Sequence, residues 1–273
     1  MNVTKELVDS LCAIADEAGR AIMEVYQSGF SSVEKADQSP LTLADLRADA
    51  VIRARLEQEF PGMYILSEES CSGGSHDSCA PFFLVDPLDG TKEFLKRNGE
   101  FTVNIALVVQ GRAVAGVVYA PALEKMYYAG ERHGAWRRSA EGTVQLQVTP
   151  WDGQAVLRII GSRSHGGDEL AEWMHALPCD CALVTAGSSL KFCLVAEGHA
   201  DVYPRLAPTS QWDTAAAQCV LEQAGGFVKS VHGHPLSYGL AQEILNSSFV
   251  AYGNGIPSEF LPIKRKYSVV SSA

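Results

Sequence analysis

Apolar side chains recur every three or four positions in two stretches near the start of the chain. The first stretch predicts an amphipathic helix over residues 7–25, whose buried face carries Leu7, Leu11, Ile14, Ala18, Ile22 and Val25. After a turn-rich segment, residues 31–40, a second helix is predicted to begin at Thr42 and to end at Pro61-Gly62. Its buried side is expected to consist of Leu46, Ala50, Ile52, Leu56 and Phe60. Each helix then has one face with which to cover a sheet.

Short runs of strand-forming residues predict a meandering sheet after the second helix, at residues 63–66, 82–85, 102–109, 113–119 and 126–128. After about Trp151 strands and helices alternate, at residues 156–160, 168–177, 182–184, 189–197, 201–203 and 213–224. Gly225-Gly226 is expected to end the last helix. We therefore predict an α/β fold in which an N-terminal α+β half, residues 1–150, packs on a C-terminal α/β half, residues 151–273, with the polar segment 140–153 as the boundary.

Charge and composition restrict the function. The 22 Lys+Arg against 32 Asp+Glu give a formal net charge of −10, which repels nucleic-acid backbones, so an anionic substrate would need local positive charge such as metal ions. No G-x-G-x-x-G follows a strand and no G-x-x-x-x-G-K-[ST] occurs, so neither a dehydrogenase nor a P-loop kinase is supported. The partner is expected to be a small molecule and not a nucleic acid.

The location is expected to be the cytoplasm. Charged residues within the first twenty or so positions prevent a signal-peptide core, and no stretch reaches the ~18 apolar residues of a membrane span. Seven scattered cysteines without C-x-x-C indicate reduced thiols. The tail, residues 256–273, is expected to be a solvated terminus, although its Lys264-Arg265-Lys266 leaves a phosphoinositide or nucleic-acid contact as the less favoured alternative.

Residues 82–94 carry the most informative motif. An apolar run brings Asp86 to the end of a strand, and Asp89-Gly90 forms a tight turn that can fold the second carboxylate back beside the first. Thr91 then begins a short helix whose N–H groups favour an anion such as phosphate. Taken alone, the motif fits an Asx turn with a helix cap equally well.

Two further acidic positions lie at element ends. Glu68 and its neighbour Glu69 follow a predicted strand, and Asp213 opens a helix of small residues; alone, these would be a solvated loop and a helix cap. Together with Asp86 and Asp89, Glu68 and Asp213 form an oxygen-only set that suits Mg²⁺ or Mn²⁺ rather than zinc. The pair His232 and His234 could in principle bind a metal, but no third ligand is near in the sequence. We therefore expect these two histidines to lie in a surface loop without a metal.

The segments Asp86-Pro87-Leu88-Asp89-Gly90-Thr91 and Trp212-Asp213 through Gly225-Gly226 resemble the signatures of the inositol monophosphatase superfamily of lithium-sensitive, Mg²⁺-dependent phosphatases. Within it, the chain is most similar to the CysQ-type 3'(2'),5'-bisphosphate nucleotidases. The resemblance implies a layered αβαβα fold and two Mg²⁺ ions, with a loose third at Glu68 left open and Mn²⁺ as a substitute. It assigns one ion to Glu68, Asp86 and the Leu88 carbonyl, and the second to Asp86, Asp89 and Asp213.

The resemblance also implies how the substrate is held and attacked. It places substrate contacts at Glu68, Leu88, Asp89, Gly90, Thr91 and Asp213, and the turn from Leu88 to Thr91 would grip the phosphate that is cleaved. It pairs Asp45 with Thr91 as catalytic residues that orient the attacking water and take its proton. From the residues alone, Thr42-Leu43-Ala44-Asp45 has the spacing of a capping box, and both roles can coexist.

Three later segments bear on the substrate. By resemblance to the bisphosphate nucleotidases, His165, Ser188, Lys191 and Arg205 contact the nucleotide; taken alone, the two cations fit surface positions and His165 fits an ordinary loop. Residues 205–211 contain no carboxylate, whereas inositol-type members tend to carry an acid there, and its absence suits a doubly phosphorylated substrate.

The expected activity is therefore Mg²⁺-dependent hydrolysis of the 3'-phosphate of adenosine 3',5'-bisphosphate (PAP) to AMP and phosphate, in sulfate assimilation and nucleotide turnover. The sulfated precursor PAPS, converted to APS, is a second target. The alternatives are an inositol or sugar phosphate monophosphatase and, in a different class, an inactive nucleotide- or metal-binding regulator. The oligomeric state stays open, as does the peripheral association with the cytoplasmic face of the inner membrane that the resemblance allows.

Overall fold

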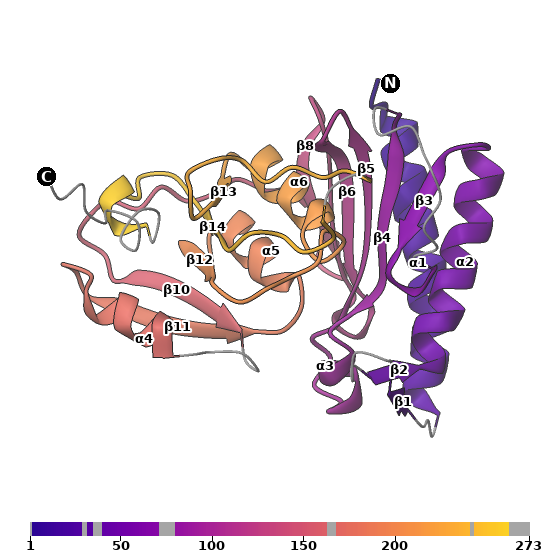
Figure 1. Cartoon of the computed structure of the whole chain (residues 1–273), viewed down its shortest axis with the longest axis horizontal. Coiled ribbons are helices and arrows are strands. Elements are labelled where there is room, and N and C mark those ends of the chain that lie inside the picture. The colour runs from indigo at the N-terminus through magenta and orange to yellow at the C-terminus, as the bar shows by residue number, and fades with distance from the viewer. Residues whose placement is uncertain are drawn as a thin grey trace, which may run out of the picture.

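Two β-sheets separate three layers of helices in the computed structural model, giving the order α, β, α, β, α (Figure 1). The structure describes residues 2–28, 32–34, 40–70, 80–162, 168–240 and 243–261. This arrangement confirms the predicted layered α/β fold. Three buried apolar clusters fill the spaces between the layers.

The first layer consists of α1 (Lys5–Gln27) and α2 (Leu43–Glu59), which pack on each other and on one face of the larger sheet (Figure 1). In α1 the predicted apolar face is buried. In α2 the prediction was wrong for Leu46, which is 47% exposed, and for Ala50, which is also exposed. The inward face of α2 instead carries the buried carboxylates Asp45 and Asp49, which have polar partners inside the protein.

The larger sheet is the predicted meander, continued by two strands that the sequence did not indicate. Its strands follow one another in chain order: β3 (Tyr64–Ser67), β4 (Phe82–Asp89), β5 (Thr102–Val109), β6 (Arg112–Ala120), β7 (Lys125–Gly130), β8 (Gly134–Ser139) and β9 (Gly142–Gln145). Only β3 and β4 pair in parallel. All four residues of β9 are exposed, so this edge strand has no apolar alternation by which to recognise it. The pairing of β4 with β5 shifts register between Asp86 and Asp89, which changes where the end of β4 aims its side chains.

The middle layer contains α5 (Leu190–Ala196) and α6 (Ala215–Gln223), which lie between the two sheets (Figure 1). Helix α6 rests on β5, β6 and β7. It approaches β6 so closely that a Cβ on Gly116 would lie 2.5 Å from the carbonyl oxygen of Ala216. The apolar cluster of this layer draws residues from both sides of residue 150, and the boundary at residues 140–153 stays a prediction.

The smaller sheet has the strand order β11-β10-β12-β14-β13. The strands β10 (Leu157–Ser162), β11 (Cys181–Ala186) and β12 (Val202–Arg205) were predicted and pair in parallel; β13 (Phe227–Ser230) and β14 (Phe249–Tyr252) were not predicted and join antiparallel. Helix α4 (Asp168–His175) packs on the outer face. A short helix, η3 (Ser258–Phe260), follows β14.

The expectation of a solvated tail is wrong for the part of the tail that the structure describes. Leu261 is 4% exposed, and the indole Nε1 of Trp173 donates to the carbonyl of Phe260 at 2.9 Å. The first residues of the tail therefore pack on the outer layer through Phe260 and Leu261. Residues 262–273 lie outside the described residues.

Three smaller expectations concern local features. Part of the turn-rich segment forms a two-stranded sheet of β1 (Ser32–Glu34) and β2 (Pro40–Thr42). The described cysteines are free, as expected: Cys12, Cys179, Cys181, Cys193 and Cys219. Within the described ranges, none of the helices has the length and apolar character that crossing a membrane requires.

Candidate active site

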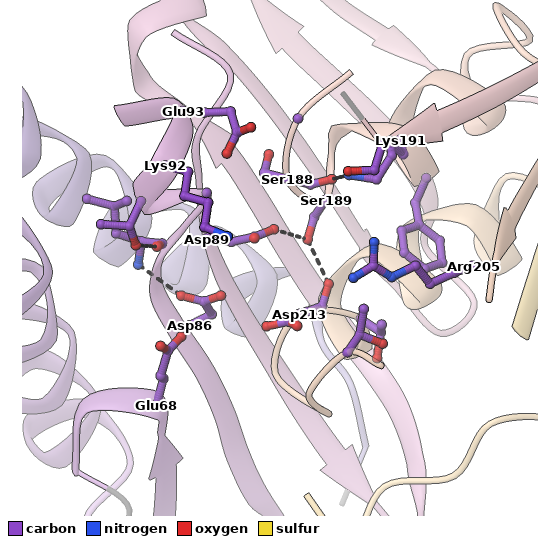
Figure 2. A pocket seen from close by; sticks show the side chains of 18 of the residues that line it. Glu68, Asp86, Asp89, Lys92, Glu93, Ser188, Ser189, Lys191, Arg205 and Asp213 are labelled. Atoms are coloured by element: carbon purple, nitrogen blue, oxygen red, sulfur yellow. Dashed lines mark hydrogen bonds between the residues drawn. The ribbon is translucent and has the colours of Figure 1, made fainter. Parts of the chain in front are cut away.

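A cavity of about 240 Å³ opens where the end of β4 meets the middle layer (Figure 2). Its wall is built from η1 (Glu68–Ser70), the turn into α3 (Thr91–Leu95), the segment before α5, the end of β12 and the segment before α6. It is lined by nearly all of the site residues predicted from the sequence, namely Glu68, Asp86, Leu88, Asp89, Gly90, Thr91, Ser188, Lys191, Arg205 and Asp213. His165 lies outside the described residues, so its role stays a prediction.

Three carboxylates converge at one end of this cavity. Glu68, Asp86 and Asp213 each offer an oxygen, and these oxygens lie within 4.8 Å of one another. Burial raises the pKa of Asp86 well above its usual value, and the neighbouring charges of Glu68, Asp89 and Asp213 raise it further. Burial and the charge of Asp89 likewise raise the pKa of Asp213 to about 8.

This cluster has the properties of a cation site. A bound positive charge relieves negative groups whose pKa values are raised by burial and, in addition, by mutual repulsion. The ligand atoms are all oxygens, which suits a hard divalent cation. His232 and His234 are exposed, in agreement with the predicted surface loop.

The register shift at the end of β4 explains how Asp86 and the following turn come to face the same space. The N–H of Leu88 donates to Asp86 Oδ1 at 3.0 Å, which holds that carboxylate against its own turn. Gly90 then adopts a φ of 92°, a left-handed conformation that favours glycine, and caps α3. The turn therefore exposes Leu88, Gly90 and Thr91 to the cavity.

Asp89 lies beside the three-carboxylate cluster, and its side chain points to the middle layer (Figure 2). Its Oδ2 accepts hydrogen bonds from Ser189 Oγ at 2.8 Å and from Asn104 Nδ2 at 3.4 Å. Neither partner was among the site residues predicted from the sequence. A buried asparagine inside the apolar run of β5 was a usable signal, because a buried amide requires polar partners.

Asp45 forms the predicted capping box and also contacts Thr91, the residue with which the resemblance pairs it. Its Oδ2 accepts from the backbone N–H of Thr42 at 2.8 Å and from the Thr42 hydroxyl at 2.5 Å, which is the capping box of α2. Its Oδ1 accepts from Thr91 Oγ1 at 3.4 Å. The same hydroxyl lies 3.5 Å from the carbonyl of Leu88. The cap thus fixes the carboxylate that faces Thr91.

The opposite wall of the cavity carries positive charge. Lys191 is only 6% exposed, which excludes a surface position; its Nζ donates to the carbonyl of Ser188 and lies 5.5 Å from the ring centroid of Tyr203. Burial lowers the pKa of Lys191 to about 8. Arg205 donates through Nη2 to Pro208 at 2.9 Å.

Two polar atoms on this wall have no hydrogen-bond partner among the described residues. They are the buried Nε of Arg205 and the buried Oγ of Ser188, whose backbone has a φ of 45°. Buried polar atoms without partners are costly unless a ligand or water satisfies them. Lys92, which the sequence analysis did not select, is exposed and also lines the cavity (Figure 2).

A second cavity of about 140 Å³ adjoins the first and shares Ser162, Tyr203 and Arg205 with it. Its other lining residues come from α4, from β12 itself and from the segment after β12. The combined space therefore exceeds what a single phosphate group fills.

Comparison with known proteins agrees with this geometry. The model of the inositol monophosphatase family matches residues 4–258. The chain belongs to this family. Family members are generally metal-dependent, which fits the carboxylate cluster.

Relatives within the inositol monophosphatase family include nucleotidases. The chain is 46% identical to the 3'(2'),5'-bisphosphate nucleotidase CysQ of Escherichia coli (strain K12), over 89% of this chain and 98% of that protein. The crystal structure of CysQ from Bacteroides thetaiotaomicron is 36% identical, covers 93% of this chain and 98% of its own, and superposes with a TM-score of 0.78. An IMPase from Thermotoga maritima, 21% identical with a TM-score of 0.77 over 93% of this chain and 95% of its own, shares the fold.

Proposed function

We propose that this protein is a phosphoric monoester hydrolase that removes the 3'-phosphate of adenosine 3',5'-bisphosphate, giving AMP and phosphate. One observation carries the proposal: across a single cavity, a partly buried cluster of carboxylates faces a wall whose hydrogen-bond donors include two without a partner among the described residues. A cation site beside an anion site is what cleavage of a phosphate ester requires. The names of the CysQ relatives support the choice of substrate.

The proposed cofactor is Mg²⁺, two ions, with Mn²⁺ as a substitute and a loose third ion at Glu68 as an open alternative. Glu68, Asp86 and the Leu88 carbonyl would hold one ion, and Asp86, Asp89 and Asp213 the second. When bound, such ions supply positive charge to the phosphate and lower the pKa of a water. The raised pKa values of Asp86, Asp89 and Asp213 support this assignment, since a bound cation would offset the cost of burying these carboxylates and the repulsion of Asp86 and Asp213 by their neighbours.

The chain's own residues would position the reactants. Thr91 Oγ1, which donates to Asp45 Oδ1, would orient the attacking water. The proton that the water loses would pass through this hydroxyl to the Asp45 carboxylate. Because the other oxygen of Asp45 is engaged by Thr42, the acceptor cannot rotate away. Leu88, Gly90 and Thr91 would hold the phosphate that is cleaved.

The rest of the nucleotide would lie against the opposite wall. Arg205 and Ser188 have donors for the phosphate that does not react, or for the ribose. Lys191 would support them, since its ammonium group holds the Ser188 carbonyl. His165 is proposed as a further contact. The adjoining cavity gives space for the base, and the same site would accept the 3'-phosphate of PAPS, giving APS.

The proposed setting is sulfate assimilation and nucleotide turnover in the cytoplasm. The free described cysteines accord with a reducing compartment. A peripheral contact with the inner membrane stays open, as does the oligomeric state.

Product analysis tests the proposed function. Purified protein, stripped of metal and then supplied with Mg²⁺, is expected to convert adenosine 3',5'-bisphosphate into 5'-AMP, identified by chromatography against authentic 5'-AMP and adenosine 3'-phosphate. Adenosine 3'-phosphate as the product would contradict the proposed orientation. Binding of the bisphosphate without any phosphate release, at all Mg²⁺ levels, would favour the inactive regulator instead.

A further inference from the structure

A buried hydroxyl lies where strand β5, the end of β4 and the segment before α6 meet. Ser189 is 2% exposed and is the N-cap residue of α5. Its Oγ lies 2.8 Å from Asp89 Oδ2 and 2.7 Å from the backbone carbonyl of Asp213. One serine thus contacts, through a single atom, two of the proposed metal-binding residues, one from each half of the chain (Figure 2).

The side chain of Asn104 on β5 sets the orientation of the Ser189 hydroxyl. Its Nδ2 donates to Ser189 Oγ at 2.9 Å, and Asn104 is 1% exposed. A serine oxygen has one proton and accepts through its lone pairs. Since the amide of Asn104 donates to that oxygen, the hydroxyl proton is directed to the other side, toward Asp89 and Asp213.

This contact has a mechanical consequence. Asp89 belongs to β4 in the larger sheet, whereas Asp213 precedes α6 in the middle layer. The carboxylates of Asp89 and Asp213 belong to separate layers and line the same cavity, and like charges this close repel each other. The Ser189 hydroxyl lies between the Asp89 carboxylate and the backbone carbonyl of Asp213 and shares its one proton between these two acceptors, and so holds the two segments at a fixed separation before any cation binds.

We propose that Ser189, oriented by Asn104, is a positioning residue that assembles the Asp89 and Asp213 part of the metal site across the two layers. The inference rests on the proposed function for its activity readout. It adds that the affinity for the divalent cation depends on two uncharged residues outside the ligand set. Groups that hold metal ligands in place typically change metal affinity by about 10- to 100-fold when they are removed.

The test compares Ser189→Ala and Asn104→Leu with Thr102→Val. Thr102 neighbours Asn104 on the same face of β5, is fully buried, and its hydroxyl has no partner among the described residues, so its near-isosteric replacement is a matched control. Binding of Mn²⁺ to the substrate-free protein is followed by electron paramagnetic resonance. In parallel, the Mg²⁺ concentration for half-maximal phosphate release is measured, together with kcat and KM at saturating Mg²⁺.

We expect Ser189→Ala and Asn104→Leu to weaken Mn²⁺ binding and to raise the Mg²⁺ requirement by about 10- to 100-fold. At saturating Mg²⁺ the KM for substrate should stay near the wild-type value, and Thr102→Val should stay within about twofold in every measurement. Mn²⁺ affinity of Ser189→Ala within twofold of wild type would overturn the inference, as would an equal loss in Thr102→Val.

Two further outcomes are decided by the same experiment. If wild-type protein cleaves no phosphate ester, the proposed function fails, while the Mn²⁺ comparison still decides the positioning role. If Ser189→Ala does not fold, Asn104→Leu decides; failure of both variants to fold in the presence of Mg²⁺ would assign the pair a structural role and overturn the inference.

Discussion

Replacement of Arg205 by methionine should separate bisphosphate substrates from monophosphates. The guanidinium lines both cavities, and its buried Nε has no partner among the described residues, so a substrate phosphate or hydroxyl would satisfy it. A hydrogen bond that involves a charged group contributes about 1.5–3 kcal/mol. At 1.36 kcal/mol per tenfold change, this corresponds to a loss of roughly 13- to 160-fold in kcat/KM for adenosine 3',5'-bisphosphate.

The assay measures phosphate release from the bisphosphate and from a small monophosphate ester, at saturating Mg²⁺. Arg205→Met should lose activity mainly on the bisphosphate and mainly through KM, because Arg205 is not a proposed metal ligand. Lys191→Met should lose at least as much, since its removal also frees the strained Ser188. Arg112→Met is the matched control, because that arginine is exposed on β6 and lies outside both cavities. Equal losses on both substrates, or no loss on either, would refute the assignment.

Four further predictions concern the metal site and the fold. Asp86→Asn should lose metal affinity and turnover, while Glu69→Gln should be milder; more activity in Asp86→Asn at saturating Mg²⁺ would contradict the ligand assignment. Millimolar lithium should inhibit phosphate release in the presence of Mg²⁺. Unchanged phosphate release at several Mg²⁺ concentrations would contradict the expected lithium sensitivity. Because the pKa of Asp213 is raised to about 8, the metal-free folded protein keeps a proton that the unfolded chain loses above about pH 4; its stability should fall as pH rises from about 4 to 8. The rise in melting temperature that Mg²⁺ causes should therefore be larger at pH 8 than at pH 6. A smaller rise at pH 8 would contradict this role of the Asp213 proton. Gly116→Ala should destabilise the protein by about 1–3 kcal/mol, because its Cβ would meet α6, and an unchanged denaturation midpoint would contradict that close packing.

The carboxylates of the candidate site could be predicted because each lies at the end of an element or of a predicted run. Glu68 follows β3, Asp86 follows the predicted strand at residues 82–85, Asp89 ends β4, and Asp213 precedes α6. Their convergence depends on a β4 that continues to Asp89 past the predicted end at Val85. An irregularity of strand register has no periodic pattern by which to recognise it.

The missed features share one physical cause, which is tertiary context. The apolar pattern of α2 suggested that Leu46 is buried, but the helix turns Asp45 inward because partners on other elements satisfy it. Asn104 and Ser189 are far apart in the sequence, and only their contact across the layers reveals a network. The edge strand β9 has Val144 as its one large apolar residue and buries none of its four residues, so pairing with β8 alone defines it.

The most direct test of the proposed function is the ratio of kcat/KM for adenosine 3',5'-bisphosphate to that for inositol 1-phosphate, measured with one preparation at one Mg²⁺ concentration. If Arg205 and Ser188 bind a second phosphate or the ribose, the bisphosphate should be preferred by at least about tenfold, the value of one charged hydrogen bond. Equal values, or a preference for inositol 1-phosphate, would contradict the assignment of this site to a bisphosphate nucleotidase.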